Sequence, residues 1–145
     1  MPSPENVAGR LLSLMPVIRE RLLKPGEAAW RSRLSTLQFF TLSLLQKRGP
    51  LTMGDLAQHL QVSKQQLTSI VDRLIEQDAV CRGRDAGDRR VVNVDLTSGG
   101  ADLLESVRGE ARRALASKLA PLSEAELEEL ERSISKVQEI LGRVA

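Results

Sequence analysis

The sequence predicts a mostly α-helical protein with a small β-hairpin, which is the winged helix-turn-helix fold, with further helices at both ends. Two observations predict this fold. A pair of short amphipathic helices lies between residues 52 and 77, and a basic hairpin follows between residues 79 and 96. The length of 145 residues suits one domain. We therefore expect residues 1–145 to form a single domain, with residues 35–96 as its winged-helix lobe.

The first helix of the pair has its apolar residues at helical spacing, namely Met53, Leu56, Ala57 and Leu60. Thr52 is placed to cap it, and a tight break follows at Gln61 and Val62. Ser63 is placed to cap the second helix, with Gln66 at the reciprocal position of a capping box. The apolar face of the second helix carries Leu67, Ile70, Val71, Leu74 and Ile75. The opposite face is polar and carries Lys64, Gln65, Thr68, Ser69, Asp72 and Arg73.

A hairpin follows the helix pair. Residues 79–84 and 91–96 are strand-like, and the loop between them reads Asp85-Ala86-Gly87-Asp88-Arg89-Arg90. The basic residues of the hairpin are Arg82, Arg84, Arg89 and Arg90. A basic two-stranded ribbon directly after a helix-turn-helix is a wing.

These segments give the chain a resemblance to the MarR family of bacterial transcription regulators. Three features carry it: the helix pair LAQHLQVSKQQLTSIVDRL, the wing DAGDRR, and LTSGG opening the next helix. The order of the flanking helices also matches, so the resemblance covers nearly the whole chain. One departure is Asp78, which stands where the family often has Gly after the recognition helix. Asp tolerates the left-handed backbone better than most residues, so the fold is still expected.

The resemblance implies a cytoplasmic homodimer that binds double-stranded DNA at a pseudo-palindromic operator and regulates a nearby promoter, most simply as a repressor. The amides of Gln65 and Gln66 suit adenine, and Thr68 and Ser69 reach bases or phosphates. Lys64 and Arg73 are expected to hold phosphates. Arg89 is expected to probe the minor groove or its backbone, braced by Arg90 or Asp85. The predicted DNA-binding residues are Ser63, Lys64, Gln65, Gln66, Thr68, Ser69, Arg73, Arg84, Asp85, Arg89 and Arg90. The resemblance also implies relief by a small aromatic or phenolic ligand between the lobe and the dimer helices.

The segments outside the lobe, residues 1–34 and 97–145, are expected to supply dimerisation helices. Residues 6–23 form a helix that is apolar on more than one face, with a kink or restart at Pro16 and an end at residues 24–26. Residues 97–120, capped by Thr97, and residues 123–141, opened by a Ser123–Glu126 capping box, also carry apolar stripes. Such stripes at both ends of the chain exceed what one lobe covers, so we expect them to pack against a second subunit.

The helix from Ser35 to Lys47 completes the lobe, with Gln38 placed for a capping box. Its expected core residues are Leu37, Phe40, Leu44 and Leu45. Trp30, just upstream, is interpreted as a partly buried anchor, with stacking on a ligand as the alternative.

Composition limits the other functions. The single His59 and single Cys81 supply neither a catalytic triad nor a closed zinc site, and no phosphate-binding glycine motif occurs, so we expect no enzyme activity, metal or cofactor. No apolar stretch is long enough to span a membrane. Residues 51–96 carry six Lys and Arg against seven Asp and Glu, which leaves open a winged-helix protein-interaction module without DNA binding. Cys81 is interpreted as a small strand residue, with a redox sensor as the alternative.

Overall fold

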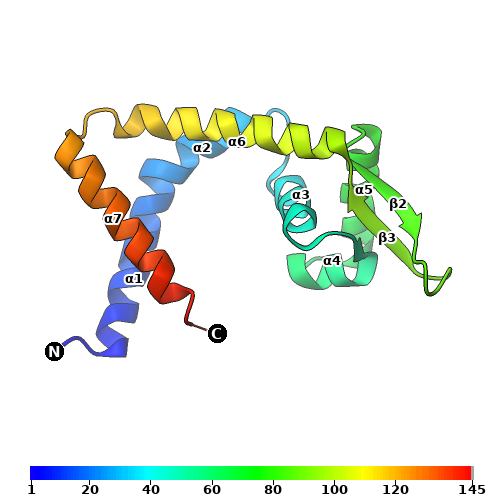
Figure 1. The fold of residues 1–145 in the computed structure, drawn as a ribbon, viewed down its shortest axis with the longest axis horizontal. Helices are drawn as coiled ribbons and strands as arrows, with labels where there is room; N and C mark the ends of the chain where they lie inside the picture. The colour runs from blue at the N-terminus through cyan, green and yellow to red at the C-terminus, as the bar shows by residue number, and fades with distance from the viewer. Residues whose placement is uncertain (145) are drawn as a thin grey trace. The chain divides into compact units, whose positions relative to one another are not determined.

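The computed structural model describes residues 1–144 and divides them into two compact units (Figure 1). One unit is Glu27–Ala111, and the other is Met1–Gly26 with the chain from Arg112 onward. The mostly helical winged fold that the sequence predicts is confirmed. The assignment of residues 35–96 to DNA binding and of residues 1–34 and 97–145 to dimerisation stays a prediction. The boundaries of the two compact units differ from the boundaries of these predicted segments.

The unit Glu27–Ala111 contains the helix-turn-helix and the wing. Its helices are α3 (Thr36–Arg48), α4 (Met53–Leu60) and α5 (Lys64–Glu76), followed by the start of α6 (Ser98–Leu119). The wing strands are β2 (Val80–Arg84) and β3 (Val92–Leu96), paired antiparallel from Val80 with Leu96 to Arg84 with Val92. A short strand β1 (Leu51–Thr52), which the sequence analysis missed, pairs with β3 and gives the strand order β1-β3-β2.

The core of this unit joins the inner faces of α3, α4, α5 and α6 to the sheet. Its fully buried side chains include Leu34, Leu42, Leu45, Leu56, Leu67, Val71, Leu74, Val94, Leu104 and Val107. The buried face predicted for α5 is therefore confirmed. Trp30 is 6% exposed, and its ring stacks on Phe39 with the centroids 4.8 Å apart. The interpretation of Trp30 as a buried anchor of the lobe therefore agrees with the structure.

The prediction that Phe40 is a core residue was wrong, because its side chain is 51% exposed. Phe39 and Leu42 are the α3 residues that pack inward instead. Helix α3 is apolar around most of its circumference, so the spacing of its apolar residues does not identify one buried face. Phe39 packs inward because its ring stacks on the buried ring of Trp30. The Ser35–Gln38 capping box is confirmed.

The first helix also differs from its prediction. Helix α1 (Pro4–Ile18) runs through Pro16 without a break, and the irregular turn comes later, as a π-helix over Arg19–Leu23. The chain then continues as α2 (Lys24–Trp30), so the predicted end at residues 24–26 was wrong. Pro25 has no N–H and its ring would crowd the carbonyl one α-turn back. The wider π-turn just before it makes room for the ring.

In the other unit, the helical segments leave most of their apolar side chains uncovered. Over the described residues, neither α1 nor α7 (Glu124–Leu141) contains a buried residue. The exposed apolar side chains on α1, α7 and their flanks are Val7, Leu11, Leu12, Leu14, Met15, Val17, Leu23, Leu127, Ile134, Val137, Ile140, Leu141 and Val144. The Ser123–Glu126 capping box of α7 is confirmed. None of the helices within residues 1–144 combines the length and apolar composition needed to cross a membrane.

Candidate nucleic-acid interface

Helix α5 presents a capped N-terminus and a fully polar outer face. The Ser63 hydroxyl accepts the backbone N–H of Gln66 at 3.1 Å, which confirms Ser63 as the cap. The Gln66 side chain is exposed rather than committed to its helix end. The outer face carries the exposed side chains Lys64, Gln65, Gln66, Thr68, Ser69, Asp72, Arg73 and Glu76. The Thr68 hydroxyl donates to the Lys64 carbonyl at 2.9 Å, which fixes its rotamer.

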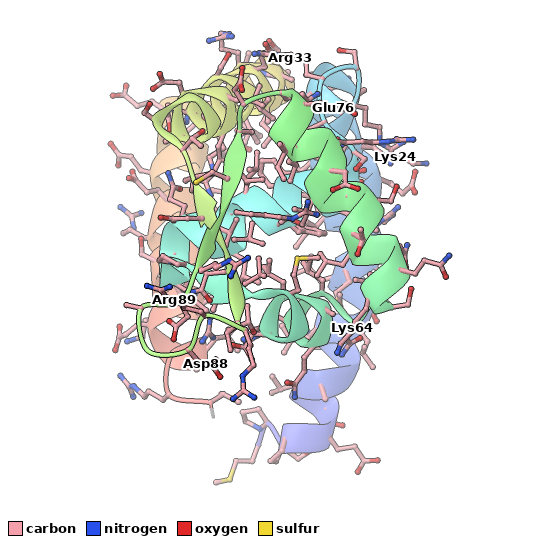
Figure 2. All side chains as sticks on the ribbon, turned by 90° about the vertical axis from the view of Figure 1, so that its right-hand side faces the viewer. Lys24, Arg33, Lys64, Glu76, Asp88 and Arg89 are labelled. Atoms are coloured by element: carbon pink, nitrogen blue, oxygen red, sulfur yellow. The ribbon has the colours of Figure 1, made fainter. Side chains whose placement is uncertain are left out.

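The helical repeat sorts these side chains around α5. Gln65, Ser69, Asp72 and Glu76 form the central outward stripe, because they follow each other at intervals of three or four residues. Lys64 and Arg73 are nine residues apart, about two and a half turns, so they project from opposite flanks of that stripe. Two cations therefore flank a central row that is neutral at the N-terminal end and acidic at the other. Figure 2 shows Lys64 near the first of these ends and Glu76 near the second.

Two left-handed residues set the start and the end of α5. Gln61 has φ 55°, and the N–H of Val62 that follows bonds to the Ala57 carbonyl at 3.1 Å, which closes the turn between α4 and α5. Asp78 has φ 56°, and its carbonyl accepts the hydroxyl of Thr97. Asp78 thus adopts the left-handed conformation in which helices most often end on glycine, as its tolerance of that conformation predicts.

The wing loop is organised by Asp85. Its Oδ2 accepts the backbone N–H groups of Gly87 at 3.1 Å and Asp88 at 3.2 Å, and its Oδ1 accepts the side-chain amide of Asn93 at 3.3 Å. These bonds hold the turn on which Arg89 stands. Asp85 was predicted to brace the Arg89 side chain, and its bonds go to the loop instead.

A second carboxylate, Asp88, holds Arg90. Its Oδ1 accepts the backbone N–H of Arg90 at 3.0 Å and the Nε of the same residue at 3.2 Å. The backbone bond and then the guanidinium keep the pKa of Asp88 below its usual 3.8. A carboxylate with a lowered pKa is charged at neutral pH, and the bonds that need its charge are lost only as the pH falls through that lowered value. Asp88 was not among the residues predicted from the sequence, although the spacing Asp-x-Arg was a local signal for it.

Arg89 stands beside this clamp at the tip of the wing, exposed and pointing outward (Figure 2). At the base of the wing, Arg82 reaches back to α5, with its Nη2 2.6 Å from Oδ1 of Asp72. Arg84 is exposed and lies two residues further along β2, on the same face as Arg82. The structure thus brings the polar face of α5 and the cations of the wing onto one compact unit.

Cys81 is exposed on β2, opposite Asp95 on β3. Strand side chains alternate, so Cys81 lies on the other face of the ribbon from Arg82. Its redox role stays a prediction.

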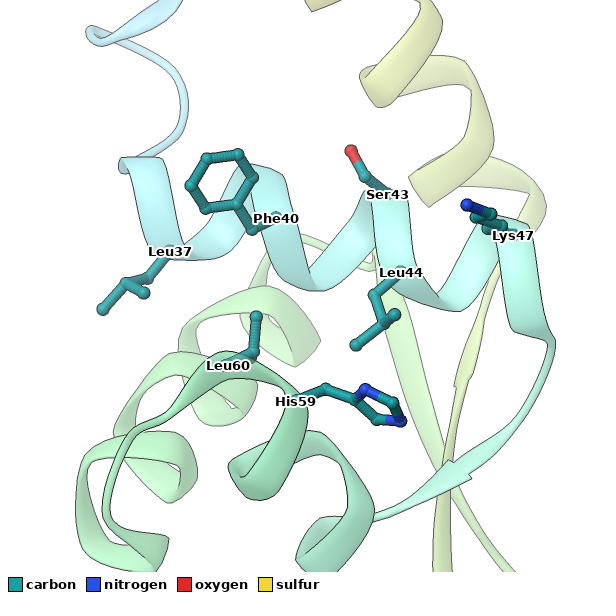
Figure 3. A pocket seen from close by; sticks show the side chains of 7 residues that line it. All are labelled: Leu37, Phe40, Ser43, Leu44, Lys47, His59 and Leu60. Carbon is teal, nitrogen blue, oxygen red and sulfur yellow. The ribbon is translucent and has the colours of Figure 1, made fainter. Parts of the chain in front are cut away.

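A hollow of about 400 Å³ lies between α3 and the end of α4 (Figure 3). Its walls are Leu37, Phe40, Ser43, Leu44, Lys47, His59 and Leu60. Four of these side chains are apolar, and the charged group among them is the Lys47 ammonium. The hollow can therefore take an apolar body with an anionic edge, of the size of a small ligand.

Comparison with known proteins agrees with this geometry. Residues 34–92 match the model of the MarR family. The chain is 31% identical over 112 residues to the HTH-type transcriptional regulator PecS of Dickeya dadantii, covering 75% of this chain and 68% of that protein. It is 28% identical over 116 residues to the HTH-type transcriptional repressor MdtR of Bacillus subtilis, covering 80% and 75%. A solved MarR family protein from Bacillus stearothermophilus superposes with a TM-score of 0.74 at 26% identity, covering 98% of this chain and all of that one.

The fold and the polar helix beside a basic wing define a winged-helix transcription regulator. The chain belongs to the MarR family. Members of this family are DNA-binding regulators of transcription and not enzymes, so family membership confirms the expectation of a non-enzymatic protein.

Proposed function

We propose that this protein is a cytoplasmic repressor that binds a pseudo-palindromic operator in double-stranded DNA as a homodimer. The observation that carries the proposal is the outward face of α5, which is polar throughout and capped by Ser63, next to a wing whose tip presents Arg89. A helix with this face fits the major groove. The wing cation reaches the adjacent backbone or minor groove.

In this proposal the residues divide into two kinds. Gln65 and Gln66 lie in the first turn of α5 and read base edges, with Ser69 one turn further on. Lys64, Arg73, Arg84 and Arg89 neutralise phosphates and carry no sequence information. Ser63, Asp85 and Arg90 hold the helix end and the wing loop in place, and Thr68 contacts a base or phosphate from the flank of Lys64.

The homodimer is supported by the exposed apolar side chains of α1 and α7. This many exposed apolar side chains on two helices mark an interaction site. Both helices lie near the ends of the chain, and membership of the MarR family implies that such end helices interleave between two subunits. A second copy presents the same apolar surface and covers it in a closed, symmetric assembly.

Salt titrations on two duplexes test the DNA-binding proposal. One duplex is selected from a random pool by the wild-type protein, and the other has a scrambled sequence. Gln65→Ala or Gln66→Ala is expected to cost about 1–3 kcal/mol on the selected duplex and little on the scrambled one. Gln58→Ala, an exposed glutamine on α4, is the matched control and should change neither. Equal losses on both duplexes would mean that α5 does not read sequence. The absence of salt-dependent binding to either duplex would favour the protein-interaction module instead.

We also propose that the hollow on α3 and α4 holds the small aromatic or phenolic effector. All the residues that line this hollow belong to the winged-helix lobe, whereas the resemblance implies a site between the lobe and the dimer helices. Its apolar walls fit a ring, and Lys47 supplies a counter-ion for a phenolate or carboxylate. Its wall residue Leu60 is followed at once by Gln61, the left-handed residue of the turn into α5. A ligand seated there therefore presses on the turn that orients the DNA-reading helix.

Fluorescence of Trp30, the single tryptophan, offers a direct test of the effector site, because its ring stacks on Phe39, which contacts the pocket residue Phe40 edge-on. Benzoate as the probe is expected to change this fluorescence and to weaken operator binding. Lys47→Gln should weaken both effects. Arg48→Gln, the neighbouring cation that does not line the hollow, should leave them unchanged. An equal response of the two variants would place the ligand elsewhere.

A further inference from the structure

An ion pair joins α5 to the base of the wing. It connects Asp72 on the helix with Arg82 on β2, ten residues further along the chain, with 2.6 Å between Oδ1 and Nη2. Both side chains remain partly exposed, 52% for Asp72 and 39% for Arg82. Anything that docks on the outer face of α5 therefore meets this pair.

Asp72 occupies the stripe that would face DNA. It follows Gln65 by seven residues and Ser69 by three, so it lies on the same side of the helix, about two turns from Gln65. A free carboxylate at that place would repel phosphates. Because Arg82 neutralises Asp72, the carboxylate of Asp72 repels phosphates less than an unpaired carboxylate would.

The same pair also restrains Arg82. Its cross-strand neighbour is Val94, which is fully buried, so Arg82 emerges on the face of the ribbon that packs toward the core and α5. From there its guanidinium reaches Asp72, and the pair stays partly exposed to solvent. Arg84, two residues on, carries the next cation of this face toward the wing tip.

We propose that Asp72 determines how strongly this protein discriminates between DNA sequences, by holding the base of the wing to α5 and by withholding Arg82 from the DNA backbone. This inference rests on the proposed DNA binding. Phosphate contacts strengthen binding to every sequence alike. A cation that is tied to Asp72 adds no such contact, and a wing fixed to α5 presents Arg89 in one register relative to the reading residues.

The test is Asp72→Asn, which keeps the shape of the side chain and removes its charge. Freed Arg82 should add one phosphate contact per subunit, so the salt slope on scrambled duplex steepens by about two in a dimer. Affinity for scrambled duplex at low salt should rise on the order of tenfold, and the ratio of selected to scrambled affinity should fall. Glu76→Gln is the matched control. It removes one charge from the same stripe, one turn further on, and leaves the pair intact.

Two results would overturn the proposal: an unchanged ratio in Asp72→Asn, or an equal fall of the ratio in Glu76→Gln. The complementary variant Arg82→Gln leaves Asp72 without its partner and should weaken binding to both duplexes. In the double variant Asp72→Asn with Arg82→Gln, the affinity for scrambled duplex should return toward the wild-type value. Failure of this return would show that the two residues act independently.

A measurement without DNA separates this inference from the proposed function. Amide hydrogen exchange in Val80–Arg84 and Val92–Leu96 should be faster in Asp72→Asn than in wild type and unchanged in Glu76→Gln, because the wing loses its tie to α5. If wild type shows no duplex preference, the proposed function fails. The exchange rates then still decide whether Asp72 positions the wing, and equal rates in all three proteins would refute that role.

Discussion

Replacing Arg89 by Gln tests whether the wing touches DNA. Arg89 is exposed at the wing tip, and none of the hydrogen bonds or ion pairs described for residues 1–144 engages its side chain. Arg90 beside it is held by Asp88 through its backbone N–H and its guanidinium. The structure therefore makes Arg89, and not Arg90, the cation that is available to a phosphate.

The magnitude follows from counterion release. Each lost phosphate contact lowers the slope of log affinity against log salt by about 0.9, so a dimer that loses two contacts has a slope lower by about 1.8. Between 50 and 200 mM salt, the wild-type protein should then lose about twelvefold more affinity than Arg89→Gln. The loss should be the same on selected and scrambled duplexes, because a phosphate contact carries no base information.

The assay is fluorescence anisotropy of labelled duplexes over this salt range, with Arg90→Gln as the neighbouring control. Arg90→Gln removes an equal charge, but Asp88 already holds that guanidinium, so Arg90→Gln should remove no phosphate contact and its slope should change less. Unchanged slopes in Arg89→Gln would show that the wing does not contact DNA. A larger slope change in Arg90→Gln than in Arg89→Gln would refute the division of roles drawn from the Asp88 clamp.

Three further outcomes are expected. Gly100→Ala should destabilise the protein by about 3 kcal/mol in thermal unfolding, because its Cβ would lie 2.0 Å from the Ala79 carbonyl oxygen. Gly9→Ala is the control: its Cβ would lie in open space on α1, so the free energy of unfolding should rise by about 0.5–1 kcal/mol. Sedimentation at micromolar concentration should give a dimer, and a stable compact monomer would contradict the role assigned to the apolar faces of α1 and α7. Mild peroxide or alkylation of Cys81 should leave operator affinity nearly unchanged, whereas a tenfold loss that thiol reverses would establish the redox-sensor alternative.

Features encoded within a few residues were predictable from the sequence. The caps at Ser35, Ser63 and Ser123 depend on residues three positions apart, and the left-handed Asp78 depends on its own backbone preference. The buried face of α5 is predictable because a continuous polar face opposes it. These signals are local, so tertiary contacts did not need to be known.

Features that depend on distant partners were not predictable. The ring of α3 that packs against the core is the half-buried Phe39 and not Phe40, because Phe39 stacks on Trp30, which lies outside the helix. The Arg82–Asp72 pair joins a helix to a strand, and no residue spacing predicts how these two elements pack. From the sequence, Asp72 was placed only on the polar face of its helix. Strand β1 is two residues long, and only its pairing with β3 defines it.

The negative charge sum of residues 51–96 leaves a protein-interaction module open, but the positions of the charges favour DNA binding. Asp72 and Asp88 neutralise Arg82 and Arg90, and Asp85 is used by the wing loop. Lys64 lies at the N-terminal end of α5 and Arg89 at the wing tip, whereas Glu76 and Asp78 lie at the opposite end of α5. The helix dipole has the same polarity. The charges of the lobe therefore sum to a negative value although the N-terminal end of α5, which would enter the groove, is positive. A steep dependence of DNA affinity on salt is compatible with such a lobe.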